Sequence, residues 1–212
     1  MTLTSALIFG PFFAGLGLLL CKPNWLRIPV VALATLAACC GTIALACLPL
    51  PGAIPALELS AHWSKVATLV VELGMGLYVV WVGLRAKRPL IVALMVVQAG
   101  LMVWLEATAG AHLEAANNLF VDKLAVIMAL INGIVGGGIC LYALGYMREY
   151  HEEAHKEVAD RRPFFFALLF VFMGAMFGII FANSLLWLFL FWEITTLCSF
   201  LLIGYSQTEE AR

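Results

Sequence analysis

Long apolar stretches separated by short charged segments are the feature of this sequence that most limits its fold. A helix needs about 20 mostly apolar residues to cross the hydrocarbon core of a bilayer. Several stretches approach or exceed that length, and each is closed by charged residues, proline or a polar turn. They occupy residues 3–21, 28–48, 66–84, 90–104, 124–146, 163–182 and 183–205. The sequence therefore predicts about seven transmembrane helices.

Helices, rather than strands, are expected in these stretches. Their hydrophobicity does not alternate with a period of two, and a helix satisfies its own backbone hydrogen bonds, as lipid requires. The chain is 64% hydrophobic and 12% charged, whereas a soluble domain has about 45–50% apolar and about 25% charged residues. The first stretch lacks the basic start of a signal peptide, so we expect a retained helix. The predicted fold class is an all-α membrane protein, a polytopic helical bundle.

The basic residues predict the orientation of this bundle. With seven spans, alternate loops share one side of the membrane, and cytoplasmic loops carry the excess of lysine and arginine. One side has only Lys65 and Lys123. We therefore expect the N-terminus outside and the C-terminus in the cytoplasm. The other basic residues all fall on the cytoplasmic side: Lys22, Arg27, Arg85, Lys87, Arg88, Arg148, Lys156, Arg161, Arg162 and Arg212.

Charge and ligand residues exclude several functions. The net charge is -1 and no basic face is apparent, so we expect no nucleic-acid partner. The chain has neither a C-x-x-C pair nor a phosphate-binding glycine loop. We therefore expect no cofactor and no metal in this chain. Haem ligation within the bundle is also disfavoured, because all four histidines are predicted to lie in loops: His62, His112, His151 and His155.

Glu193 is the most informative single residue, because it lies near the middle of the last apolar stretch. An acidic side chain at the centre of a bilayer costs about 2.5–3.5 kcal/mol on insertion scales. A carboxyl group there is either neutral or paired, and a neighbouring charge can switch its affinity for a proton. We predict a proton-transfer role for Glu193. The alternative is a protonated side chain that only forms a hydrogen bond between helices.

Other polar residues in the apolar stretches are weaker candidates. Thr196 lies one turn from Glu193, and Thr195 and Ser199 form a second polar pair, so these hydroxyl groups could order water or a proton wire. Glu72 lies within the third stretch, where it could belong to an ion path, bind a partner helix or reach the interface.

A run of small residues marks the fifth stretch. Glycines let membrane helices approach closely, so packing is the first interpretation of this run. A hinge or a water path is the alternative. The residues are Gly133, Gly136, Gly137 and Gly138.

The second half of the chain resembles a known family. The segments LFVDKLAVIMALINGIVGGGICLYALGYM and PFFFALLFVFMGAMFGIIFANSLLWLFLFWEITTLCSFLLIGY, within residues 119–208, are similar to the antiporter-like subunits of respiratory complex I. Relatives of those subunits occur in multisubunit cation/proton antiporters and in energy-converting membrane-bound hydrogenases. The second segment looks most like the hydrogenase and formate hydrogenlyase branch. Residues 1–118, with four predicted helices, resemble the family less clearly than residues 119–212, with three.

The resemblance implies a role for Glu193 and a missing partner. In the family, the glutamate of the WE motif lies in mid-membrane, pairs with a lysine on a later helix and takes part in proton translocation. The family's usual fourteen or so helices extend beyond this glutamate helix. The lysines of this chain all fall at helix ends or in loops. The resemblance therefore implies either a subunit divided between two polypeptides or a fragment of one.

The expected function is a membrane subunit of a redox-driven ion pump, contributing the glutamate half of an antiporter-like module. It would be a non-redox subunit of a hydrogenase or quinone oxidoreductase type of complex. Its expected partners are lipid, peripheral redox subunits on the cytoplasmic side and membrane subunits, one of which supplies the remaining helices and the lysine. The expected location is the cytoplasmic membrane of a prokaryote. The alternatives are a stand-alone secondary transporter and a purely structural membrane subunit.

Overall fold

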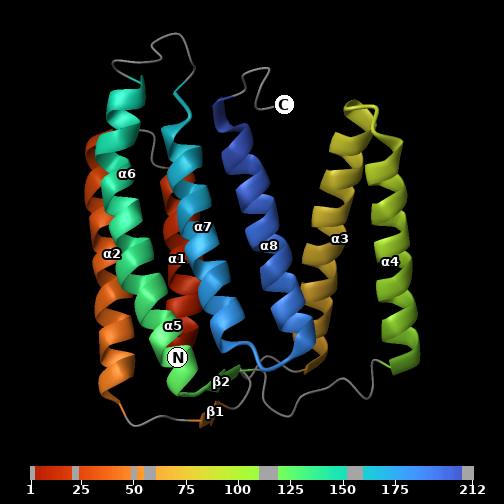
Figure 1. Cartoon of the computed structure of the whole chain (residues 1–212), viewed down its shortest axis with the longest axis horizontal. Helices are drawn as coiled ribbons and strands as arrows, with labels where there is room; N and C mark the ends of the chain where they lie inside the picture. The colour runs from red at the N-terminus through yellow and green to blue at the C-terminus, as the bar shows by residue number, and fades with distance from the viewer. Residues whose placement is uncertain are drawn as a thin grey trace.

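The computed structural model describes residues 3–20, 24–48, 52–54, 61–109, 119–151 and 160–206. Its helices stand side by side with nearly aligned axes (Figure 1). One long rod is continuous through three elements, an α-helix, a π-helical turn and a second α-helix. The helices are α1 (Leu3–Leu20), α2 (Asn24–Cys47), α3 (Ala61–Arg85), α4 (Pro89–Ala109), α5 (Lys123–Leu130), η1 (Ile131–Gly136), α6 (Gly137–Glu149), α7 (Arg162–Phe181), α8 (Leu185–Ile203) and the short 3-10 helix η3 (Gly204–Ser206).

The predicted all-helical membrane architecture is confirmed in its main outline. Within the described residues, 5 helices are long and apolar enough to cross a membrane. They are Leu3–Leu20, Trp25–Cys47, Lys123–Glu149, Arg162–Phe181 and Leu185–Ile203. Helix α4 counts only as a shorter apolar helix, Pro89–Trp104. The protein is thus a multi-pass membrane protein, and the count of about seven spans stays a prediction.

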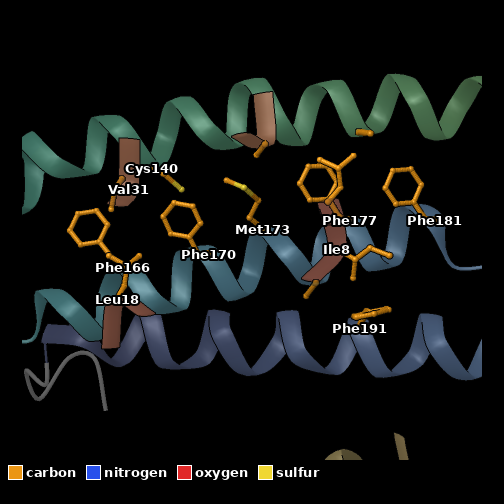
Figure 2. Close-up of a cluster of buried hydrophobic side chains, with 14 of the residues drawn as sticks. Ile8, Leu18, Val31, Cys140, Phe166, Phe170, Met173, Phe177, Phe181 and Phe191 are labelled. Atoms are coloured by element: carbon orange, nitrogen blue, oxygen red, sulfur yellow. The ribbon is translucent and has the colours of Figure 1, made fainter. Parts of the chain in front are cut away.

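Helix α7 is the centre of the core. Its phenylalanines recur at helical spacing, so one face of α7 presents a continuous row of rings to the surrounding helices. Figure 2 shows Phe166, Phe170, Phe177 and Phe181 in this row, with Met173 among them. All five are at most 3% exposed. The core is completed by residues of other helices that pack on this row, among them Ile8, Leu18, Val31, Cys140 and Phe191.

Small residues allow the closest helix contacts. A Cβ atom added at Gly174 would lie 2.9 Å from the carbonyl oxygen of Ile8, and one at Gly15 would lie 2.9 Å from that of Ala167. Glycines on both helices therefore bring α1 against α7 almost backbone to backbone. In the same way, a Cβ at Gly133 would lie 2.6 Å from the Thr42 hydroxyl oxygen.

The glycine run of the fifth predicted stretch also contains a π-helical turn. Within η1, the Asn132 side chain donates a hydrogen bond of 3.1 Å to the carbonyl oxygen of Met173. The Cys39 thiol donates to the carbonyl oxygen of Gly133 at 3.0 Å. Both interactions fasten the turn to neighbouring helices, which supports the packing interpretation of this run. Because π-helical turns widen a helix locally, the run departs from regular helix as well.

Three local features go beyond the predicted helices. Strands were not expected, yet β1 (Gly52–Ile54) and β2 (Leu119–Val121) form a short antiparallel pair with Ala53 opposite Phe120. Ser184 occupies the cap position of α8 and makes no side-chain cap bond. Asp122 caps α5, because its carboxylate accepts a bond of 2.7 Å from the Ala125 amide.

The strand pair makes the α3–α4 hairpin an insertion. Since β1 precedes α3 and β2 follows α4, the chain leaves and re-enters the bundle at nearly the same point. Helices α3 and α4 pack on each other at the edge of the molecule, and α3 is the one that lies beside α8 (Figure 1). Among their described side chains, none belongs to the buried core. The hairpin therefore lies outside the phenylalanine core that organises the other helices.

Candidate functional site

Glu193 lies in the middle of α8 on the side opposite the core. Phe191 and Cys198, which are 3% and 2% exposed, face the body of the bundle. Positions two and five residues away along a helix fall on other faces, so Glu193 points away from α7. The side chain is half-buried because the α3–α4 hairpin covers it. Glu193, the acidic residue of the otherwise apolar helix α8, thus faces the α3–α4 hairpin.

Gln98 of α4 is the hydrogen-bond partner of Glu193. Its side-chain amide donates to the carboxylate oxygen Oε1. Sequence reasoning missed Gln98, although it is the only amide side chain in the apolar stretch 90–104 and that signal was available. The bond partly compensates for taking a carboxyl group out of water, because buried polar groups need such partners.

Glu72 of α3 lies on the same pocket as Glu193. The pocket has a volume of about 160 Å³ and opens between α3, α4 and α8. Glu72 and Glu193 are its acidic residues, and one of the Glu72 carboxylate oxygens is fully buried. Gln98 is the other polar residue of the lining. The rest is apolar: Leu69, Leu73, Gly76, Leu77, Val80, Met95, Val96, Ala99, Met102, Val103 and Phe189.

The arrangement can exchange protons but offers little else. Two carboxyl groups can bind and release protons, whereas the carboxamide of Gln98 can only orient them. An apolar wall raises the cost of ionising either carboxyl group and strengthens its response to a nearby charge. Among the described residues, no group of three His, Cys, Asp or Glu side chains could hold a metal ion.

The hydroxyl groups predicted to support Glu193 bond to their own helix. Thr195 and Thr196 donate to the carbonyl oxygen of Trp192 at 2.7 and 3.0 Å. Ser199 donates to the carbonyl oxygen of Thr195 at 2.9 Å. None of the three lines the pocket that holds Glu193 and Glu72. Their part in a proton wire stays a prediction.

A second polar cluster lies where α6, α7 and η3 meet. His151 and Tyr205 share a hydrogen bond of 2.8 Å, and both are buried. Burial is the main reason why the pKa of Tyr205 rises to about 12. Beside them, Arg162 holds Asp160 through hydrogen bonds of 2.8 and 2.7 Å. This cluster fastens helix ends, and none of its four residues lines the Glu193 pocket.

The expectation that all histidines lie in loops is corrected in part. His151 ends a helical segment and is 9% exposed, and the backbone of His62 lies in the first turn of α3. His112 and His155 lie outside the described residues. None of the four is in the middle of a described helix.

Comparison with known proteins confirms the predicted resemblance. Residues 104–156 match the family described as NADH-ubiquinone oxidoreductase (complex I), chain 5 N-terminus. The match covers the end of α4, β2 and the α5–η1–α6 rod. It supports a resemblance to antiporter-like, complex I-related membrane subunits, in the N-terminal part of those proteins. Glu193 lies beyond the matched residues.

Curated relatives point in the same direction. The chain is 31% identical over 100 residues to the Na(+)/H(+) antiporter subunit A1 of Staphylococcus haemolyticus and to that of Staphylococcus aureus strain Newman. Each match covers 47% of this chain and only 11% of the relative. No solved structure matches the chain. The similarity to the hydrogenase and formate hydrogenlyase branch stays a prediction.

Proposed function

We propose that this chain is a membrane subunit of an ion pump and contributes Glu193 to a proton-translocating, antiporter-like module. Glu193 takes up a proton in one arrangement of the module and releases it in another. Glu72, which lines the same pocket, lies on the ion path. The redox reaction that drives the pump belongs to peripheral subunits on the cytoplasmic side.

The observation that carries this proposal is the environment of Glu193. Its carboxyl group lies in the middle of an apolar helix, lines a pocket and has the neutral amide of Gln98 as its hydrogen-bond partner. A neutral donor tolerates both the protonated and the ionised carboxyl group. Approach of a cation would favour the ionised form, and its departure would favour reprotonation.

The cation in this proposal is a lysine of a partner chain. The described lysine side chains, Lys87 and Lys123, lie in the α3–α4 turn and at the first residue of α5, so neither reaches the middle of α8. A membrane subunit that supplies further helices would bring this lysine to Glu193. The complex would lie in the cytoplasmic membrane of a prokaryote.

Copurification tests the partner part of this proposal. A tagged chain, extracted in a mild detergent, should retain other membrane subunits and peripheral redox subunits. Purification of the chain alone with full transport activity would contradict the divided module and favour a stand-alone transporter. The proton-transfer part is tested by Glu193→Gln, which a purely structural subunit should tolerate and a proton carrier should not.

A further inference from the structure

The α3–α4 hairpin combines weak attachment with a position over the key carboxyl group. Its two ends meet at the β1–β2 pair, and no described side chain of the hairpin enters the buried core. Its main contact with the rest of the bundle runs along α8. Moving the hairpin away from α8 would therefore leave the packing around α7 intact.

The hairpin covers the part of α8 that carries Glu193. Gln98 binds Glu193, and Glu72 brings a second carboxyl group to the same pocket. Around this polar contact, apolar residues of both units line the pocket, such as Met102 on α4 and Phe189 on α8. These residues close the membrane-facing side of Glu193 with groups that carry no positive charge.

We propose that the α3–α4 hairpin is a movable cover over Glu193, held closed by the Gln98 hydrogen bond. The proposal rests on the proton-transfer function of Glu193. In the closed arrangement, Gln98 satisfies the carboxyl group and the hairpin separates it from any other helix. In the open arrangement, the same face of α8 admits water or a helix that carries a cation.

The face of α8 that carries Glu193 cannot hold the hairpin and a cation-bearing helix at the same time. A carboxyl group changes its proton affinity only if its surroundings change from one arrangement to the other. The structure contains one of them, a neutral amide in an apolar pocket. None of the described glycines of the hairpin makes with α8 the close backbone approach that Gly15 and Gly174 make between α1 and α7. It is the side on which an exchange of partners disturbs the fold least.

Carbodiimide labelling in membranes tests the cover directly. A hydrophobic carbodiimide reacts with protonated carboxyl groups that it can reach, and mass spectrometry assigns the adduct to Glu193 or Glu72. Gln98→Ala should speed the labelling of Glu193 by roughly fivefold, the factor that corresponds to about 1 kcal/mol for one net hydrogen bond. Val97→Ala is the matched control, because Val97 is 57% exposed and does not line the pocket.

A reversible lock provides the second arm. With the native cysteines replaced, Met102→Cys and Phe189→Cys place one thiol on each unit at the pocket. Joining them with a short bis-methanethiosulfonate reagent, which forms one disulfide with each thiol and releases two sulfinate ions, should slow Glu193 labelling at least fivefold and stop transport. Reduction of the two disulfides should restore both. Labelling that responds to neither Gln98→Ala nor the lock would overturn the cover.

The two proposals fail separately in these experiments. If Glu193→Gln abolishes transport but labelling ignores the hairpin, only the cover is wrong. If labelling responds as expected while Glu193→Gln transports normally, the cover exists and the proton-transfer role of Glu193 is wrong.

Discussion

The side-chain amide of Gln98 on α4 donates a hydrogen bond to the carboxylate of Glu193 on α8. The two residues are 95 positions apart in the sequence, and the bond joins the inserted hairpin to the helical body. A carboxyl group within an apolar helix thereby acquires a partner from its own chain. Glu72 of α3 lines the same pocket as Glu193 of α8, so both carboxyl groups can be tested by substitution.

Glu72→Gln tests whether the second carboxyl group belongs to the ion path. This change preserves the shape of the side chain and removes its ability to carry a proton. We expect transport to fall by roughly tenfold, corresponding to about 1.4 kcal/mol, while assembly is unchanged. Proton uptake by vesicles, normalised to assembled complex, measures the effect. Normal uptake would assign Glu72 to a structural role.

Gly174→Ala tests the close contact between α1 and α7. The added Cβ would lie 2.9 Å from the carbonyl oxygen of Ile8 and 2.8 Å from the Phe12 ring, so the helices must separate. We expect a loss of about 1–3 kcal/mol in stability, measured by thermal unfolding in detergent. Gly10→Ala is the control, because nothing lies within 4 Å of its added Cβ. Equal stabilities of the two variants would contradict the described packing.

Asp160→Asn tests the ion pair before α7. Hydrogen bonds from Arg162 are the main reason why the pKa of Asp160 falls from 3.8 to about 2. A carboxyl group whose pKa is lower in the folded state than in the unfolded state stabilises the fold fully at a pH above its unfolded pKa. This stabilisation is lost as the pH falls through the folded pKa. The variant should therefore be less stable by at most about 1 kcal/mol near neutral pH, because Asp160 is 46% exposed. The difference from the native chain should shrink between pH 3.8 and about 2. A difference that persists at the acid end would point to another cause.

Reporter fusions test the predicted orientation. The turn between α3 and α4 contains Lys87 and lies at the same end of the bundle as the C-terminal end of α6 and the start of α7 (Figure 1). A reporter inserted after Lys87 should read as cytoplasmic, and one after Ala109, at the opposite end of α4, should read as external. The reverse pattern would invert the topology, and identical readings would show that α4 does not cross the membrane.

The helices and the central acid could be predicted from sequence because both are local signals. Apolar length predicts a membrane helix, and Glu193 is conspicuous as a charge within such a length. The first and last long helices begin and end within a few residues of the expected bounds. The hydrogen-bond partners of the hydroxyl groups near Glu193 could not be predicted. In a helix, the hydroxyl group of Thr or Ser can bond either to a neighbouring helix or to a carbonyl oxygen one turn earlier in its own helix.

The pairing of helices was beyond sequence reasoning. The role of Gln98 becomes visible only once the α3–α4 hairpin is placed against α8. The β1–β2 pair that precedes and follows this hairpin is too short to leave a pattern of alternation. The π-helical turn in η1 likewise depends on tertiary contacts, such as the bond from Asn132 to Met173. Long-range contacts of this kind follow from packing rather than from periodicity.

The central claim is that Glu193 carries protons, and proton uptake by vesicles containing the Glu193→Gln complex tests it most directly. Glutamine keeps the shape of the side chain and can still bond to Gln98, so assembly should survive. Uptake should fall by roughly a hundredfold or more, the scale of a lost proton-transfer group. Glu193→Asp, which keeps a titratable carboxyl group on a shorter side chain, should lose less. Uptake by the glutamine variant at the rate of the native complex would contradict the account.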